Sequence, residues 1–237
     1  MIRLFTVWYD AQNPARQGEL QECLRRNLGN PHLGQVWLWT CSGVAPGPDS
    51  KLLIHEENSP PTFMKLFERA NTFCAPGDVV IIANSDIWFD DTAALVEQIG
   101  PNQCYALLRW ECNGRLFSSS DGKPRPDSQD AWIFRAPIRP IGADFGLGRP
   151  RNDNALAYLL CRCGYDLRNP AKTIHIHHHH ASGVRPFGFK KFRVPPPWLH
   201  LEATTIHERG QTRLVRKTFN LKWQFRRLLQ GLERLKV

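Results

Sequence analysis

The chain has 237 residues, which is enough for one α/β domain with a sizeable core and an appendage. Its content of 42% apolar and 22% charged residues is typical of a soluble globular protein. No run approaches the roughly 18 apolar residues of a membrane-spanning helix. The net charge is +9, but residues 213–237 carry +7 of it. The body is therefore nearly neutral, which argues against a nucleic-acid groove over the whole domain. The seven cysteines are odd in number and scattered, which fits a reduced, cytoplasmic protein.

Apolar periodicity predicts the elements of the first half in chain order. A strand at 3–9 is followed by a helix that Gly29-Asn30-Pro31 ends, a strand at 35–40, a loop at 42–61, a helix at 62–73 and a strand at 79–83. This order of strand, helix and strand implies a parallel sheet. The last strand, VVIIA, is apolar on both faces, which is typical of the centre of such a sheet.

The second half continues the alternation of helices and strands. It contains a predicted short helix at 92–99, strands at 105–110 and 131–134, a polar loop at 113–130, a glycine-containing loop at 141–151, a helix at 152–163, a strand that begins at 165–167 and resumes at 173, and a helix at 214–237. The predicted fold is therefore α/β, mainly parallel, with some antiparallel pairing near its end. Proline and aromatic residues after 185 divide the chain into a domain at 1–185 and a wrapping segment with a basic helix at 186–237.

The first candidate site follows the central strand. Asn84, Ser85 and Asp86 come directly after it, and ligands of open α/β sheets bind beyond the carboxyl ends of the strands. The Asp86 carboxylate can hold a divalent cation that neutralises a diphosphate, while Asn84 offers an amide and Ser85 a hydroxyl. The alternative is that Asp86 only caps a turn, but the two acids at 90–91 are better placed to cap the next helix.

A histidine-rich segment, TIHIHHHHASGVR at 173–185, is the second candidate. If the segment is extended, alternate residues share a face, so His178 and His180 continue the face of the apolar Ile174 and Ile176. A face that changes from isoleucine to histidine leaves the core and enters a site, and imidazole is a common metal ligand. His178 and His180 are therefore predicted metal ligands, and the other histidines should face outward. The alternative is a solvated histidine run.

A third segment contains two glycines and an acid. Gly146 and Gly148 permit a tight backbone near a ligand. Asp153 lies at a predicted helix start where Asn152 alone would provide the cap, so Asp153 is free to act as a general base toward an acceptor hydroxyl. The alternative is that Asp153 only contributes favourable charge to the helix start.

The remaining candidates lie at other strand ends. Asp130 precedes the strand at 131–134, and Arg109 lies near the end of the strand at 105–110. Either is placed to position a sugar, and the alternative is a buried ion pair between them. Trp8, at the end of the first strand, and Arg185, after the histidines, complete the predicted donor-binding residues.

As an ordered set, these segments resemble bacterial glycosyltransferase-like proteins of the GT-A fold, including sugar transferases of surface-polysaccharide clusters. The resemblance covers roughly residues 3–185 and rests on FTVWYDAQNPARQGELQECLRRNLGN, PPTFMKLFERAN, VVIIANSDIWFDDT, LLRWE, DSQDAWIF, NDNALAYLLCRCGYDLRNP and HHHASGVR. It implies a nucleotide-sugar donor and commonly Mn or Mg. It also maps Asn84-Ser85-Asp86 onto the Asp-x-Asp metal motif, Asp153 onto the acidic base near the acceptor, and His178 or His180 onto the late metal-binding histidine. Asn84 stands in place of the motif's first acid, which leaves one strong carboxylate there.

The basic tail has an amphipathic helical pattern, with apolar residues recurring from Leu221 to Leu235. Such a helix can lie on an anionic membrane surface, which suits a lipid-linked acceptor. The alternative is a helix docked on its own domain or on another subunit.

The leading hypothesis is a cytoplasmic, possibly peripheral membrane enzyme that moves a sugar from a nucleotide diphosphate to a hydroxyl of a glycan or lipid-linked glycan. No nucleic-acid partner is expected for it. One alternative is a non-catalytic module that binds an anionic membrane or nucleic acid through 213–237. A second is a nucleotidyltransferase-like metal enzyme, although no P-loop is present.

Overall fold

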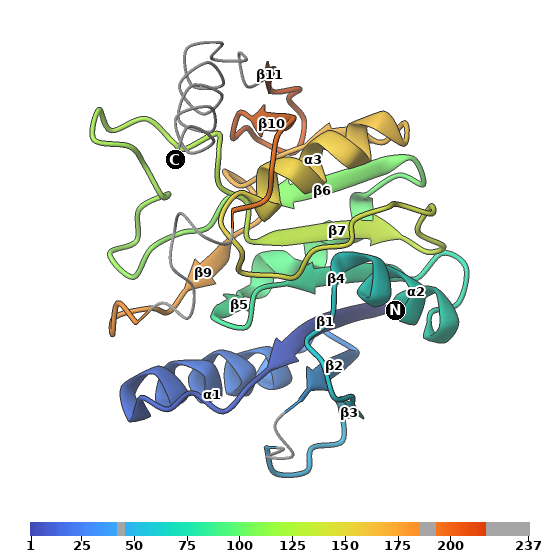
Figure 1. Cartoon of the computed structure of the whole chain (residues 1–237), viewed down its shortest axis with the longest axis vertical. Coiled ribbons are helices and arrows are strands. Elements are labelled where there is room, and N and C mark those ends of the chain that lie inside the picture. Colours follow the sequence, from blue (N-terminus) through green and yellow to red (C-terminus); the bar gives the residue numbers. More distant parts are fainter. Residues whose placement is uncertain (42–45, 185–192, 217–237) are drawn as a thin grey trace, which may run out of the picture.

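A seven-stranded mixed sheet forms the centre of the structure (Figure 1). The computed structural model describes residues 1–41, 46–184 and 193–216. The strands of this sheet are β1 (Ile2–Trp8), β2 (Gln35–Thr40), β3 (Leu52–Glu56), β4 (Val79–Ala83), β6 (Gln103–Leu107), β7 (Ala131–Arg135) and β8 (Asp166–Arg168). Their order is β3-β2-β1-β4-β7-β6-β8, and β7 runs antiparallel to its neighbours β4 and β6 while the other pairs are parallel. The predicted fold class, α/β and mainly parallel, is confirmed.

Helices cover both faces of this sheet. They are α1 (Pro14–Gly29), α2 (Phe63–Phe73), the 3-10 helix η1 (Asp91–Gln98) and α3 (Asn152–Arg162). The residues of β4 alternate between two apolar layers: Val79 and Ile81 pack with residues of α1 and η1, whereas Val80 and Ile82 pack with residues of α2 and α3. Every residue of β4 is buried, so the predicted central strand is confirmed.

Local caps explain where three of these helices begin. The Asn13 side chain accepts a hydrogen bond from the Arg16 amide at 3.1 Å, and Pro14 occupies the first turn of α1, where its missing N–H costs nothing. Thr62 caps α2. Asp90 accepts from the Thr92 amide at 2.9 Å and caps η1, which confirms one of the two acids predicted for that role.

Two small ribbons lie outside the main sheet. In the first, β5 (Ile87–Phe89) pairs antiparallel with β9 (Ile176–His178), so the segment after β4 lies beside the histidine-rich segment. In the second, β10 (Trp198–Leu201) pairs with β11 (Thr212–Val215). Trp198 packs with Ala155 of α3, which holds this ribbon against the domain.

Two of the predicted elements are wrong, and one short strand was not predicted. The predicted loop at 42–61 contains β3, an edge strand that is only partly buried and is flanked by turn-forming residues. The segment after Ser85 contains β5, whose three residues are too few for a periodic pattern. Leu214 and Val215 lie in β11 rather than in a helix, because Leu214 pairs with Leu199. The rest of the predicted tail helix, 217–237, lies outside the described residues.

Two other predictions have a limited outcome. The division of the chain at 185/186 stays a prediction, since residues 185–192 are not described. Among the residues that the structure describes, no helix is long and apolar enough to cross a membrane.

Asn27 of α1 holds β5 against the helix. Its side chain is almost fully buried, donates to the Ile87 carbonyl at 2.9 Å and accepts from the Phe89 amide at 3.0 Å. These two hydrogen bonds replace those that a further strand would give to this edge of β5. Asn30 adds a hydrogen bond from its amide to the Phe89 carbonyl at 2.9 Å, so two amide side chains help to position β5 and Asp86 immediately before it.

We expect Asn27→Ala to lower the free energy of unfolding by about 2–4 kcal/mol, because it leaves a buried carbonyl and a buried amide without partners. Urea denaturation measures this loss. The exposed Asn58→Ala is the matched control and should change stability by no more than about 0.5 kcal/mol. Equal stabilities of the two variants would contradict the role of Asn27.

Candidate functional site

A pocket of about 1150 Å³ lies beyond the carboxyl ends of β1 and β4. It is large enough for a substantial organic ligand. Eleven of the twelve predicted site residues line it: Trp8, Asn84, Ser85, Asp86, Arg109, Asp130, Gly146, Gly148, Asp153, His178 and His180. The twelfth, Arg185, lies outside the described residues. Segments that are far apart in the sequence are thus brought to one cavity by the order of the strands.

The three predicted metal ligands meet at one wall of this pocket. One ligand atom each of Asp86, His178 and His180 lies within 4.8 Å of the other two. The β5–β9 pairing causes this, because Ile87 pairs with His178 directly beside Asp86. The predicted alternation is also present: Ile176 is fully buried, and the His178 and His180 side chains are each 12% exposed.

Arg16 of α1 occupies the same wall, and the sequence reasoning missed it. Its Nη2 donates to Asp86 Oδ2 at 2.7 Å, and its Nη1 donates to Glu19 Oε2 at 3.0 Å. Nη1 also contacts His180 Nδ1. Glu19 in turn accepts from the Ser182 hydroxyl at 3.0 Å. Arg16 and Glu19 are each 5% exposed, so this is an ion pair inside the fold and not on its surface.

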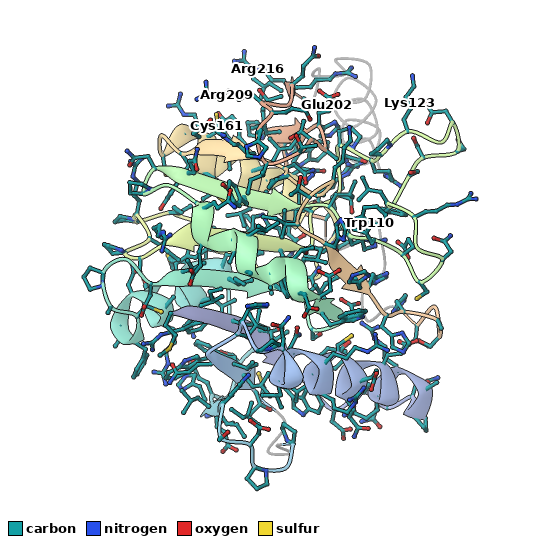
Figure 2. The ribbon with its side chains drawn as sticks, turned by 180° about the vertical axis from the view of Figure 1, so that it is seen from behind. Trp110, Lys123, Cys161, Glu202, Arg209 and Arg216 are labelled. Carbon is teal, nitrogen blue, oxygen red and sulfur yellow. The ribbon has the colours of Figure 1, made fainter. Side chains whose placement is uncertain are left out.

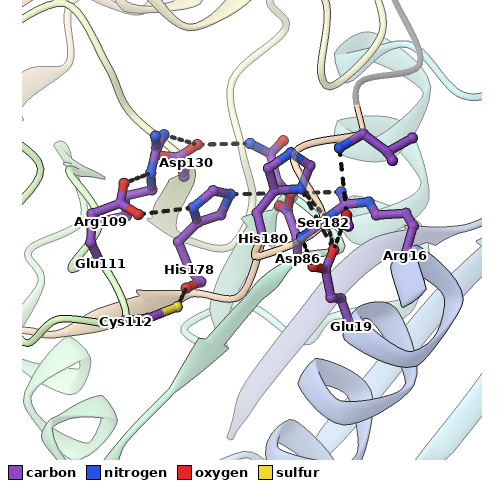
Figure 3. A network of polar contacts seen from close by, with 12 residues as sticks. Arg16, Glu19, Asp86, Arg109, Glu111, Cys112, Asp130, His178, His180 and Ser182 are labelled. Carbon is purple, nitrogen blue, oxygen red and sulfur yellow. Dashed lines mark hydrogen bonds and ion pairs between the residues drawn. The ribbon is translucent and has the colours of Figure 1, made fainter.

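The ionic contacts continue across the pocket on the other side of Asp86 (Figure 3). His178 lies 3.4 Å from Asp86 through Nε2 and 3.4 Å from Glu111 through Nδ1. Glu111 accepts from Arg109 at 2.7 Å, and Arg109 lies 3.1 Å from Asp130. Asp130 also accepts from the Asn84 amide at 3.0 Å. The Arg109–Asp130 ion pair, left open as an alternative by the sequence, is therefore formed.

This chain of contacts shifts the pKa values of its members. Burial alone would raise the pKa of Asp86, but the hydrogen bond and charge of His178 and the guanidinium of Arg16 outweigh it and hold the pKa well below its usual range. Burial opposes protonation of His178, yet its hydrogen bonds to Asp86 and Glu111 raise its pKa to about 9. The same His178 hydrogen bond, aided by Arg109, lowers the pKa of Glu111 to about 2.

Asp153 has the opposite electrostatic environment. Burial, together with the charge of Asp130, raises the pKa of its carboxyl to about 7 despite the hydrogen bond from the Asn154 amide. That amide donates to Asp153 Oδ1 at 2.8 Å, and the Gln129 amide donates to Oδ2 at 3.2 Å. A carboxylate with a pKa near neutrality is suited to accept a proton from a hydroxyl.

The loop before α3 supports Asp153 through an unusual backbone. Gly148 and Arg151 both have positive φ angles, 72° and 69°. Gly146 lies against the segment that precedes α2, where a Cβ would come within 3.3 Å of the Pro61 carbonyl. Arg151 is the residue at the cap position and makes no side-chain cap, so the prediction that Asn152 is the N-cap is wrong. Asn152 is instead the first helical residue and is buried.

Arginines and a phenylalanine form a further wall of the pocket. The guanidiniums of Arg109 and Arg125 lie over the Phe117 ring, at 3.9 and 5.3 Å from its centre. Arg125 and Arg151 both pair with Asp127, at 2.9 and 2.8 Å. The loop that carries Phe117 projects from the body of the molecule, with Lys123 on its outer part (Figure 2).

Comparison with known proteins identifies the architecture. No family model and no curated protein matches the chain. Among solved structures, it is similar to the mannosyltransferase PcManGT from Pyrobaculum calidifontis in complex with GDP-Man and Mn²⁺, with a TM-score of 0.50 and 14% identity over 75% of this chain and 56% of that one. It is similar to GalNAc-T7 with UDP, GalNAc and Mn²⁺, with a TM-score of 0.50 and 9% identity over 82% of this chain and 45% of that one. For S. aureus TarS the TM-score is 0.49 and the identity 11%, over 75% and 60% of the two chains.

The chain has the GT-A glycosyltransferase fold. It spans about half the length of the two structures on which this statement rests. At these identities the likeness concerns the architecture, so the chemistry has to be argued from the pocket itself.

Within this GT-A fold, the wall formed by Asp86, His178 and His180 fits a divalent cation. One carboxylate and two imidazoles are ligands that first-row transition ions accept, whereas Mg²⁺ prefers oxygen. Arg16 contacts two of these three groups, through Nη2 to Asp86 and through Nη1 to His180. Arg16 therefore occupies a lone pair on Asp86 and one on His180 that a bound cation could use.

The residues that were missed have a recognisable pattern. Arg16 and Glu19 lie on the same stripe of α1 as the buried Cys23 and Asn27, at helical spacing. Charged residues on a core-facing stripe indicate an internal ion pair, because an unpaired buried charge is costly. Glu111 lies two residues after Arg109, in the segment that continues β6, where alternate residues share a face.

We expect Arg16→Gln to tighten the binding of Mn²⁺, because it frees the lone pairs of Asp86 and His180. The same change should lower the stability of the metal-free chain by about 3–5 kcal/mol, since Glu19 and Asp86 lose their buried partner. Calorimetric titration with Mn²⁺ and urea denaturation measure the two effects.

Arg25→Gln is the matched control, because Arg25 lies on the same helix but is exposed and pairs only with Glu22 among the described residues. It should leave Mn²⁺ affinity unchanged. Weaker Mn²⁺ binding by Arg16→Gln than by this control would contradict this prediction.

Proposed function

We propose that this chain is a glycosyltransferase that moves a sugar from a nucleotide diphosphate to an acceptor hydroxyl. One observation carries the proposal: a single pocket at the strand ends of a GT-A fold is lined by Asp86, His178 and His180 and by the carboxyl of Asp153. The first three groups suit the diphosphate of a donor, and Asp153 suits a hydroxyl. The structures of similar architecture contain GDP-Man or UDP together with Mn²⁺, which supports a donor of this class.

The donor occupies the part of the pocket beside β1, β4 and β9 in this proposal. Trp8, Tyr9 and Trp39 line the pocket at the ends of β1 and β2, where apolar and aromatic surface suits a nucleoside. Asp86, His178 and His180 would hold a divalent cation. When bound, that cation supplies positive charge to the leaving diphosphate. Asn84 and Ser85 lie next to this wall and offer uncharged hydrogen-bonding groups to the sugar or phosphate.

The acceptor lies on the side of Asp153. Asp153 takes the proton of the attacking hydroxyl, and the nucleotide diphosphate leaves from the opposite side of the anomeric carbon. This geometry inverts the configuration of the sugar. Arg109 and Asp130 form an ion pair at 3.1 Å that fixes both side chains in the wall of the pocket. The charge of Asp130 also helps to keep the pKa of Asp153 high.

The acceptor we propose is a glycan or a lipid-linked glycan, reached from the cytoplasmic face of a membrane. The argument for the membrane is the basic amphipathic pattern of the chain up to Val237. Most of that segment lies outside the described residues, as does Arg185, which we propose as a further donor ligand. These features remain proposals that depend on the sequence.

Donor binding can be tested with nucleotide diphosphates. A ligand that binds only the native state raises the melting temperature, so UDP and GDP should each be tested with and without Mn²⁺. Stabilisation by one of them, increased by Mn²⁺, is expected. If none stabilises the chain, and an anionic vesicle or nucleic acid does, the non-catalytic alternative is favoured.

We expect Asp86→Asn to lower the rate of sugar transfer by about 10²–10³-fold, since it removes the carboxylate that would hold the cation beside the diphosphate. Asparagine keeps the shape of the side chain and one acceptor for Arg16. Release of nucleotide diphosphate in the presence of acceptor measures the rate. The exposed Asp49→Asn is the control, and an Asp86→Asn variant as active as this control would refute the assignment.

A dependence on pH is expected from the raised pKa of Asp153. The carboxyl is protonated below its pKa of about 7, and a protonated carboxyl cannot accept the proton of the hydroxyl. Below neutrality, kcat/KM should therefore fall about tenfold for each pH unit, and it should be level above. Asp153→Asn should lose most of the activity and also this acidic limb. An acidic limb that persists in Asp153→Asn would assign the titration to another group.

A further inference from the structure

A second cluster of ligand groups lies on the opposite face of the β5–β9 ribbon. One ligand atom each of Asp90, His175 and His177 lies within 4.8 Å of the other two. His177 Nε2 is 2.9 Å from Asp90 Oδ2, and His175 Nδ1 is 3.4 Å from the same oxygen. These three residues do not line the proposed donor pocket.

The register of the ribbon explains this convergence. Trp88 pairs with His177, so the next residue on the same face of β5, Asp90, comes opposite His175. His178 and His180 point the other way, toward Asp86. The histidine run is therefore divided between two faces, and each face meets one aspartate at one end of β5.

The carboxylate of Asp90 is oriented by other groups. Its Oδ1 accepts from the Thr92 amide at 2.9 Å and from the Thr92 hydroxyl. The same hydroxyl accepts from the His175 amide at 2.8 Å. Oδ2 is thereby directed to the two imidazoles. A hydrogen-bonded ligand carboxylate of this kind is a common feature of metal sites.

Aromatic rings fix the two imidazoles. The Trp88 ring stacks on His177 at 4.1 Å with an interplanar angle of 16°, and the Trp110 ring lies 4.7 Å from His175. The Trp110 indole donates to the Ala171 carbonyl at 2.8 Å, and Figure 2 shows this residue where the projecting loop meets the body of the molecule. The three ligand side chains are 25–30% exposed, so an ion can reach them from solvent.

We propose that Asp90, His175 and His177 form a second metal site, selective for Zn²⁺ or a similar late first-row ion and separate from the donor pocket. Two imidazoles and one carboxylate favour such an ion over Mg²⁺ or Ca²⁺. Three protein ligands leave a position for water. The bound ion joins the start of η1 to β9, the strand that carries His178 on its other face. The site therefore holds in place the strand that enters the donor pocket. It does not depend on the proposed glycosyl transfer.

The test uses the full chain without a polyhistidine tag. The His178→Gln, His180→Gln double variant removes the ligands on the donor side. It should still bind one equivalent of Zn²⁺ by calorimetry, and Zn²⁺ should raise its melting temperature. Adding His175→Gln and His177→Gln to this background should abolish both effects. Adding His179→Gln, a histidine of the same run that is in neither cluster, should abolish neither.

A further variant distinguishes a metal site from a loss of folding. In the His178→Gln, His180→Gln background, Thr92→Val keeps all three ligands and removes the hydroxyl that orients Asp90, so it should weaken Zn²⁺ binding by about 10–100-fold and leave the stoichiometry at one. Metal-free melting temperatures of the variants show whether each is folded. The proposal is overturned if the double variant binds no Zn²⁺, or if its Zn²⁺ binding persists when His175 and His177 are replaced in a folded chain.

Discussion

The structure depends on a buried chain of alternating charges that crosses the pocket. It runs through Glu19, Arg16, Asp86, His178, Glu111, Arg109 and Asp130, with each acid beside a cation. Burial of any one of these charges alone would cost several kcal/mol, of order 3–5 kcal/mol when a partner is removed. Their pairing therefore ties α1, β9 and the segments after β4 and β6 to one geometry. The four carboxylates of this chain of charges outnumber its three cations by one, even with His178 protonated.

Much of the fold follows from periodicity. The central strand β4 and the helices α1, α2 and α3 have long or one-sided apolar patterns, and these were predicted. β3 and β5 were not, because their stability comes from partners distant in the sequence. β5 has three residues and is held by β9 on one side and by the Asn27 side chain on the other. No local propensity encodes that arrangement, since each contact forms only after the chain has folded.

The candidate site was predicted where chemistry and position coincide. Asp86 follows an apolar strand, and the switch from isoleucine to histidine marks where β9 leaves the core. Arg16 and Glu111 were missed because a single charged residue is usually solvated. Arg16 could have been found from its place on the buried stripe of α1, because a buried charge needs an opposite charge from elsewhere in the fold. The sequence could not identify that partner, because Asp86 is 70 positions away from Arg16.

The pocket gives two aspartates opposite properties by means of their surroundings. Asp86 is ionised throughout the neutral range, because His178 and Arg16 lower its pKa by more than burial raises it. An ionised carboxylate can bind a cation. The backbone amides and the charge of Arg151 favour ionisation of Asp153, but burial and the charge of Asp130 prevail and raise its pKa to about 7. Its ionisation costs stability as the pH rises from its unfolded value, about 3.9, to about 7, where the folded carboxyl titrates. A folded chain that keeps such a carboxyl retains a destabilising group at neutral pH. Separation of two carboxyl pKa values in one cavity is the usual basis for dividing ligand and base roles between them. That division, more than the three-residue motif after β4, supports the proposed transfer of a proton from an acceptor hydroxyl to Asp153.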